Sequence, residues 1–171
     1  GNQFLANIRE TDAIVHVVRA HDDPNVVHPE GRVDPLADID TIETELIFAD
    51  LEQAERRLER VAKAAKSGDR RSVAEAEWLR ALIEALLAGR PARTVPVPTD
   101  APDAAKSLQP LTAKPVLYCC NVGEGDLPRG NAWSDSVRAR AAKEGAGMVV
   151  LCGKVEAELA DSLQVELEYL F

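Results

Sequence analysis

The sequence contains 171 residues, of which 46% are hydrophobic and 29% are charged. This composition is typical of a globular chain and excludes an intrinsically disordered one, which could not bury enough apolar surface to fold. The 29 acidic and 20 basic residues give a net charge of −9, so general attraction to nucleic-acid phosphate is not expected. We therefore predict no DNA partner, and any contact with RNA must come from a local basic patch.

The three cysteines, Cys119, Cys120 and Cys152, lie in apolar runs and have no Cys-x-x-Cys spacing. Their odd number and the lack of partnered histidines argue against a disulfide framework and a zinc site, so we expect no metal ligands. No apolar run approaches the roughly 18 residues of a membrane-spanning helix, and the N-terminus lacks a secretion signal. We predict a cytoplasmic protein that does not contact a membrane. Because the chain begins at Gly1 without methionine, we expect a fragment of a larger protein.

Short apolar runs rich in β-branched residues indicate three buried strands. They occupy residues 13–18, 115–120 and 148–152. A helical pattern precedes the first strand at residues 3–11, and another separates the second and third strands at residues 133–144. Strands that alternate with helices in this way are typical of an α/β fold with a parallel sheet.

A different pattern separates the first and second strands, because apolar residues there repeat every three or four positions. The first series comprises Ile47, Leu51, Ala54, Leu58, Val61 and Ala65, and the second comprises Ala76, Leu79, Ile83 and Leu86. A Ser-Gly-Asp sequence at residues 67–69 interrupts the repeat. The pattern predicts an antiparallel α-helical coiled-coil hairpin at residues 37–90, inserted between sheet-forming regions at residues 1–36 and 91–171. Several prolines in residues 91–113 predict an extended return to the sheet.

Basic residues gather around the predicted turn of the hairpin, and acidic residues lie nearer its base. The basic residues are Arg56, Arg57, Arg60, Lys63, Lys66, Arg70 and Arg71, and the acidic ones are Glu43, Glu45, Asp50 and Glu52. One interpretation is an ordinary solvated helical surface. The other is a basic tip that contacts RNA or a ribosomal partner, since a charge gradient supplies attraction and orientation together.

Polar residues follow two of the predicted strands. Asn121-Val122-Gly123-Glu124 comes after the second strand, and Cys152-Gly153-Lys154 ends the third. Ligands of open parallel sheets bind beyond the carboxyl ends of strands, so two such loops could enclose a nucleotide base. Gly153 would let the backbone approach a planar ring, and the aliphatic stem of Lys154 would cover it. Taken alone, the sequence at residues 121–124 is more often just a turn, and Lys154 could equally be a surface lysine before a helix.

Several consecutive segments resemble the YchF family, the Obg-like ATPases of the P-loop class. These segments are residues 1–14 (GNQFLANIRETDAI), 22–28 (DDPNVVH), 31–35 (GRVDP) and 38–39 (DI). The resemblance extends from residue 1 to about residue 161, and it implies part of a P-loop NTPase sheet with the inserted hairpin. It also implies that the phosphate-binding loop precedes Gly1 and that a small C-terminal TGS domain follows Phe171. By this resemblance, the chain alone would be inactive.

The resemblance further implies a nucleoside triphosphatase that uses ATP, and GTP less well, with Mg²⁺ held by residues outside this chain. Ribosome association is implied as well. In the YchF family an Asn-x-x-Glu motif replaces the Asn-Lys-x-Asp of most GTPases. The implied nucleotide-binding residues are Asn121, Val122, Glu124, Cys152, Gly153 and Lys154. A glutamate does not keep the geometry with which an aspartate accepts the N1 and N2 protons of guanine, so adenine loses less.

The histidines differ in what the resemblance implies for them. His28 matches the family position for a residue that orients the attacking water, whereas without the resemblance it would be an ordinary loop residue. His16 lies inside an apolar strand and is interpreted as a core residue. His21 does not match the family position and is not selected.

Two alternatives of other classes stay open from the sequence. The first is a GTP-binding switch protein without a preference for adenine. The second is a non-enzymatic module, in which the hairpin alone binds RNA or protein and the sheet only supports it.

Overall fold

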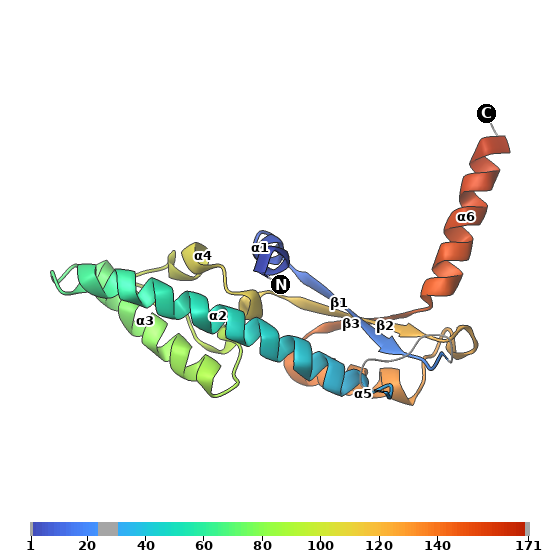
Figure 1. Ribbon diagram of the computed structural model, residues 1–171, viewed down its shortest axis with the longest axis horizontal. Helices are drawn as coiled ribbons and strands as arrows, with labels where there is room; N and C mark the ends of the chain where they lie inside the picture. The colour runs from blue at the N-terminus through green and yellow to red at the C-terminus, as the bar shows by residue number, and fades with distance from the viewer. Residues whose placement is uncertain (1, 24–30, 170–171) are drawn as a thin grey trace. The chain divides into compact units, whose positions relative to one another are not determined.

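The computed structural model describes the backbone of residues 2–23 and 31–169, and the side chains of residues 4–23 and 31–162 (Figure 1). The chain divides into two compact units. Unit 1 combines Gly1–Ile14 with Asp40–Pro115, and unit 2 combines Val15–Ile39 with Val116–Phe171.

A three-stranded sheet forms the centre of unit 2, in the order β1 (Ile14–Ala20), β2 (Val116–Val122) and β3 (Gly147–Leu151). β2 and β3 are parallel, with registers from Leu117 opposite Gly147 to Asn121 opposite Leu151. β1 runs in the same direction, because the Ile14 N–H donates to the Pro115 carbonyl at one end and the His21 ring contacts Asn121 at the other. The predicted parallel α/β sheet is confirmed.

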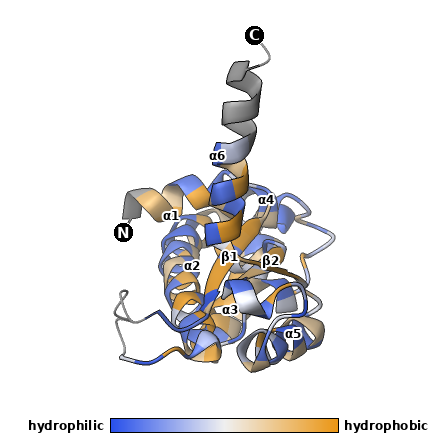
Figure 2. Ribbon diagram, turned by 90° about the vertical axis from the view of Figure 1, so that its right-hand side faces the viewer, coloured by the Kyte–Doolittle hydropathy of each residue, from blue (hydrophilic) through white to orange (hydrophobic). Residues whose placement is uncertain are grey.

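One face of this sheet carries the core of unit 2. Val18, Tyr118 and Cys120 are buried there against the helix α5 (Ala132–Glu144). β1 is coloured as hydrophobic along most of its length in Figure 2. The opposite face of the sheet includes Val15 and Val17, which are exposed.

Helical segments follow the ends of β2 and β3. The 3₁₀ helix η3 (Glu124–Asp126) follows β2, and the helix α6 (Gly153–Tyr169) follows β3. α5 begins with a capping box, in which the Asn131 side chain accepts the Ser134 N–H and the Ser134 hydroxyl accepts the Asn131 N–H. Gly130 is required before this cap, because its φ is +88° and a Cβ there would lie 2.2 Å from the Ser134 hydroxyl oxygen.

The helical hairpin of unit 1 consists of α2 (Pro35–Ala65), whose first residues belong to unit 2, and α3 (Arg70–Leu87), drawn antiparallel in Figure 1. At about 1.5 Å per residue, the 31 residues of α2 span about 46 Å. All ten residues of the two predicted apolar series belong to one cluster, either buried or packed against it. The predicted coiled-coil hairpin is therefore confirmed.

Several predicted details are wrong. The return segment contains η1 (Ala92–Thr94), the helix α4 (Ala104–Leu108) and η2 (Leu111–Ala113), so it is not extended. Pro91 and Pro110 stand at the N-caps of η1 and η2, where a missing N–H costs little, whereas Pro96 and Pro98 lie in a stretch without regular structure. The helix α1 (Asn2–Arg9) and β1 agree with the prediction to within about two residues. β2 continues through Val122, because that side chain is buried in the core, so Asn121 lies inside the strand and not after it.

Asp50 is the other departure, since its side chain is only 1% exposed and belongs to no surface charge gradient. Its Oδ1 accepts from Arg9 Nη1 at 2.9 Å and from the Leu111 N–H at 2.8 Å. Its Oδ2 accepts from the N–H and the hydroxyl of Thr112, both at 2.8 Å. The same hydroxyl oxygen accepts the Ala92 N–H at 2.8 Å. One carboxylate therefore joins α1, α2 and the return segment.

Replacing Asp50 with alanine should lower the free energy of unfolding by about 3–5 kcal/mol, because it leaves buried donors and the Arg9 charge without their acceptor. Urea denaturation of the chain measures this change. The control is Glu52→Ala, which removes an exposed partner of Arg56 on the same helix and should cost less than about 1 kcal/mol. Equal losses in the two variants would contradict the role given to Asp50.

Candidate functional site

The carboxyl ends of the three strands bring the predicted polar residues to one edge of the sheet. Asn121 and Leu151 are level with each other in the ladder between β2 and β3. Gly153 follows two residues beyond Leu151, at the first position of α6. The N–H of Gly153 donates to Asn121 Oδ1 at 2.8 Å. The two predicted loops are therefore joined by a direct hydrogen bond.

A glycine suits this junction because the approach is close. A Cβ at position 153 would lie 3.4 Å from Asn121 Oδ1, at the tight end of ordinary contact. The side-chain oxygen of Asn121 is thus committed to the backbone of α6. Its role in the observed structure is to hold two strand ends together.

Glu124 and Lys154 belong to the two segments that this bond joins. Glu124 is the first residue of η3, and its Oε2 is 3.8 Å from Lys154 Nζ. Lys154 is also 3.9 Å from Glu158 Oε1. The side chains of Glu124 and Lys154 are 65% and 70% exposed, so water screens the pair and both remain accessible.

The side chains of Val122 and Cys152 are buried, in contrast to those of Glu124 and Lys154. Val122 belongs to the core of unit 2. Only the backbone of these two residues is therefore placed to meet a ligand. The other cysteines are inert as nucleophiles, because burial raises the pKa of Cys119 and raises the pKa of Cys120 to about 11.

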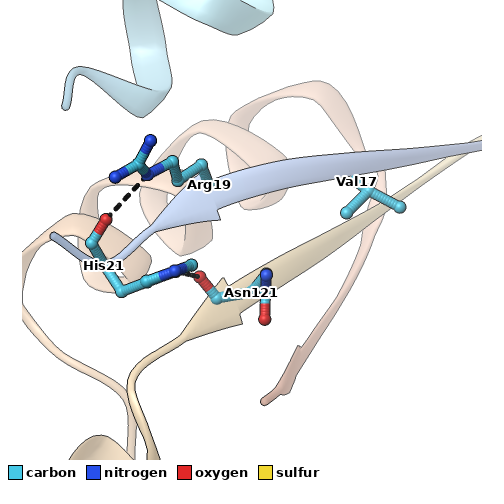
Figure 3. A pocket seen from close by; sticks show the side chains of 4 residues that line it. All are labelled: Val17, Arg19, His21 and Asn121. Atoms are coloured by element: carbon cyan, nitrogen blue, oxygen red, sulfur yellow. Dashed lines mark hydrogen bonds between the residues drawn. The ribbon is translucent and has the colours of Figure 1, made fainter. Parts of the chain in front are cut away.

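A cavity of about 360 Å³ adjoins Asn121 and is lined by Val17, Arg19, His21 and Asn121 (Figure 3). His21 Nδ1 is 3.0 Å from the Asn121 carbonyl oxygen, which can only accept, so Nδ1 carries the proton. Arg19 Nε donates to the His21 carbonyl at 3.0 Å. Sequence reasoning missed His21. The parallel pairing was the available signal, since residue 21 follows β1 and Asn121 is the penultimate residue of the neighbouring strand β2.

Asn131 connects the end of β1 with η3. Its Nδ2 donates to the Ala20 carbonyl at 2.8 Å and to Asp126 Oδ2 at 2.7 Å. The segment that begins with Glu124 is therefore tied to the first strand through the cap of α5. This contact also was not predicted, because its partners are 111 residues apart.

Known proteins resemble this chain over most or all of its length. No protein-family model matches it. The ribosome-binding ATPase YchF of Bacillus subtilis is 45% identical over 173 residues, covering 100% of this chain and 47% of that protein. The protein of the same name from Escherichia coli O157:H7 is 43% identical over 161 residues, covering 94% of this chain and 44% of that protein.

The solved structure of the Schizosaccharomyces pombe YchF GTPase superimposes with a TM-score of 0.80 at 30% identity. The matched region covers 94% of this chain and 45% of the S. pombe chain. This chain belongs to the YchF family. The predicted resemblance and fold class are confirmed, and the chain spans about half the length of the YchF proteins that it matches.

The remaining predicted YchF site residue, His28, lies outside the residues that the structure describes. In the described part of the chain, no group of three or more His, Cys, Asp or Glu side chains could hold a metal ion. None of the described helices combines the length and the apolar character needed to cross a membrane.

Proposed function

We propose that this chain is the base-recognition and hairpin part of a nucleoside triphosphatase that hydrolyses ATP in preference to GTP and associates with the ribosome. The observation that carries the proposal is the Gly153 N–H to Asn121 Oδ1 hydrogen bond, because it joins two strand-end loops into one site. The names of the YchF relatives, a ribosome-binding ATPase and a GTPase, support the same reaction class.

Base recognition would use the exposed groups around that hydrogen bond. The Glu124 carboxylate can only accept hydrogen bonds, which suits the exocyclic amine of adenine as a donor. Guanine presents two adjacent donors, and a glutamate sets its oxygens one methylene further out than the aspartate that pairs with both. The Lys154 stem and the Gly153 backbone would cover the ring, with backbone contacts from Val122 and Cys152.

The phosphates and Mg²⁺ would be bound elsewhere in the full-length protein, since the described residues provide no metal site. Phosphate affinity in P-loop enzymes comes mainly from the backbone N–H groups and the lysine of the phosphate-binding loop. We therefore expect this chain alone to be inactive and to bind ATP with a dissociation constant in the millimolar range at best.

The Glu124→Asp variant of the full-length protein should shift the preference from ATP toward GTP. Correct pairing of the two guanine donors is worth roughly 2–4 kcal/mol, which is about 30-fold to several hundredfold in relative kcat/KM. The measurement is kcat/KM for both nucleotides.

Gly123→Lys serves as the control for that variant. Its φ of −68° is ordinary, and a Cβ would lie 3.5 Å from Asp126 Oδ2, so the loop should tolerate a side chain. Gly123→Lys should leave the selectivity nearly unchanged. Unchanged selectivity in Glu124→Asp would contradict the assignment of Glu124 and would favour a switch protein that does not discriminate by this carboxylate.

The His28→Ala variant of the full-length protein should hydrolyse ATP more slowly, by roughly tenfold to several hundredfold, with ATP affinity nearly unchanged. A residue that orients the attacking water acts mainly in the transition state, so its loss reduces turnover and spares ground-state binding. Single-turnover hydrolysis at saturating ATP and calorimetric titration measure the two quantities. Parental turnover in the variant would rule out this role for His28.

Ribosome association would use the hairpin, where three basic residues remain available. Arg56 and Arg57 pair with Glu52 and Glu75, and Arg70 and Arg71 pair with Asp100 and Asp103. Within the described residues, no carboxylate lies within ion-pair distance of the others, which are Arg60, Lys63 and Lys66. Cations of this kind bind phosphate oxygens of RNA in a salt-dependent way.

Reversing Lys63 and Lys66 to glutamate should weaken ribosome cosedimentation of the full-length protein by about tenfold or more and reduce its salt dependence. The matched control reverses Arg138 and Lys143 on α5, which changes the net charge equally. The control should bind ribosomes as the parent does. If both pairs weaken binding alike, the net charge and not the hairpin governs association.

A further inference from the structure

His21 occupies a position where the backbone ladder between β1 and β2 has ended. β1 stops at Ala20, and the next residue places its ring nitrogen 3.0 Å from the Asn121 carbonyl oxygen. The imidazole Nδ1–H therefore donates to an acceptor at the end of β2 where β1 provides no further strand residue. Figure 3 shows the ring directed toward Asn121.

The position of the ring is itself fixed. Arg19 Nε donates to the His21 carbonyl at 3.0 Å, which restrains the backbone at the point where the chain leaves the strand. Asn131 Nδ2 holds the preceding carbonyl, that of Ala20, at 2.8 Å. Two side chains from different elements thus restrain consecutive peptide groups, and the imidazole extends from a constrained backbone.

Asn121 receives contacts on both its backbone and its side chain. Its carbonyl oxygen accepts from His21, and its Oδ1 accepts from the Gly153 N–H at 2.8 Å. Fixing the carbonyl limits rotation of the Asn121 peptide, and the side chain that reaches α6 depends on that backbone. The three strand ends are therefore connected in the order His21, Asn121, Gly153.

We propose that His21 is a positioning residue for nucleotide binding, which holds Asn121 so that the Asn121 and Gly153 loops present one preformed site. This inference rests on the proposed function only for the identity of the ligand. The series of hydrogen bonds from His21 through Asn121 to Gly153 is present in the chain whatever the ligand is. Preformed sites bind more tightly because less freedom is lost on binding.

The proposal requires an N–H donor at the position of His21 Nδ1, and it does not require an aromatic ring there. Nδ1 of histidine and Nδ2 of asparagine are both bonded to Cγ, so His21→Asn keeps an N–H at a similar reach. His21→Ala removes the donor, and His21→Leu removes it while keeping more of the volume. These three variants separate the hydrogen bond from the packing of the ring.

The first measurement is amide hydrogen exchange of the full-length protein without nucleotide. His21→Ala and His21→Leu should exchange the Gly153 N–H roughly three- to tenfold faster than the parent, as expected for loss of one supporting hydrogen bond. His21→Asn should exchange it at nearly the parental rate. Asn121→Ala, which removes the acceptor itself, sets the largest expected acceleration.

The second measurement is ATP binding and turnover of the same variants. His21→Ala should raise KM and the dissociation constant for ATP by roughly three- to tenfold, with kcat changed by less than about twofold. For His28→Ala the opposite is expected, namely a lower turnover with nearly unchanged ATP affinity. His21→Asn should recover most of the lost affinity.

The outcomes distinguish the two proposals. If the parent binds no ATP, the proposed function fails, and the exchange rates of the Gly153 N–H still decide the role of His21. If His21→Ala leaves both the exchange rate and the ATP affinity unchanged, the positioning role is wrong. If His21→Asn behaves as His21→Ala does, the ring acts through packing and the hydrogen-bond assignment is overturned.

Discussion

The pairing of β2 with a parallel neighbour on each side is the constraint on which the candidate site depends. Parallel strands end at the same edge of a sheet, so the backbone ladder alone brings together segments that are about 30 and 100 residues apart. The register that sets Asn121 opposite Leu151 also puts its side chain within reach of Gly153. In the proposed site, side chains would then select the ligand at a place that the backbone has already determined.

The Asp50 carboxylate has a comparable function in unit 1. The apolar seam brings α2 and α3 together, but hydrophobic contact is not directional and does not fix how the return segment follows the hairpin. Hydrogen bonds to the N–H groups of Leu111 and Thr112 are directional, and they fix η2 against α2. η2 ends at Ala113, three residues before β2 begins.

Elements marked by a repeating apolar pattern were predictable from the sequence, and individual long-range hydrogen bonds were not. The three strands and the hairpin follow from repeats of apolar residues, which report burial of one face or one seam. The burial of Asp50 has no such repeat, because a carboxylate in a helix normally faces solvent and its partners lie 41 to 62 residues away. His21 illustrates the same limit at the site, since its partner Asn121 is defined by sheet register and not by any local motif.

The charge pattern of the hairpin shows how sequence and structure differ in what they say about partners. Seven basic residues near the turn suggest a strong positive field, yet four of them are paired with carboxylates, two of which, Asp100 and Asp103, come from the return segment. With a net charge of −9, the chain as a whole repels a polyanion. Screening at physiological salt limits the field of an exposed charge to about 8 Å. Under the proposed ribosome association, Arg60, Lys63 and Lys66 would therefore act on RNA phosphate only at contact distance. The proposed recognition by the hairpin would then depend on the fit between surfaces and much less on long-range attraction.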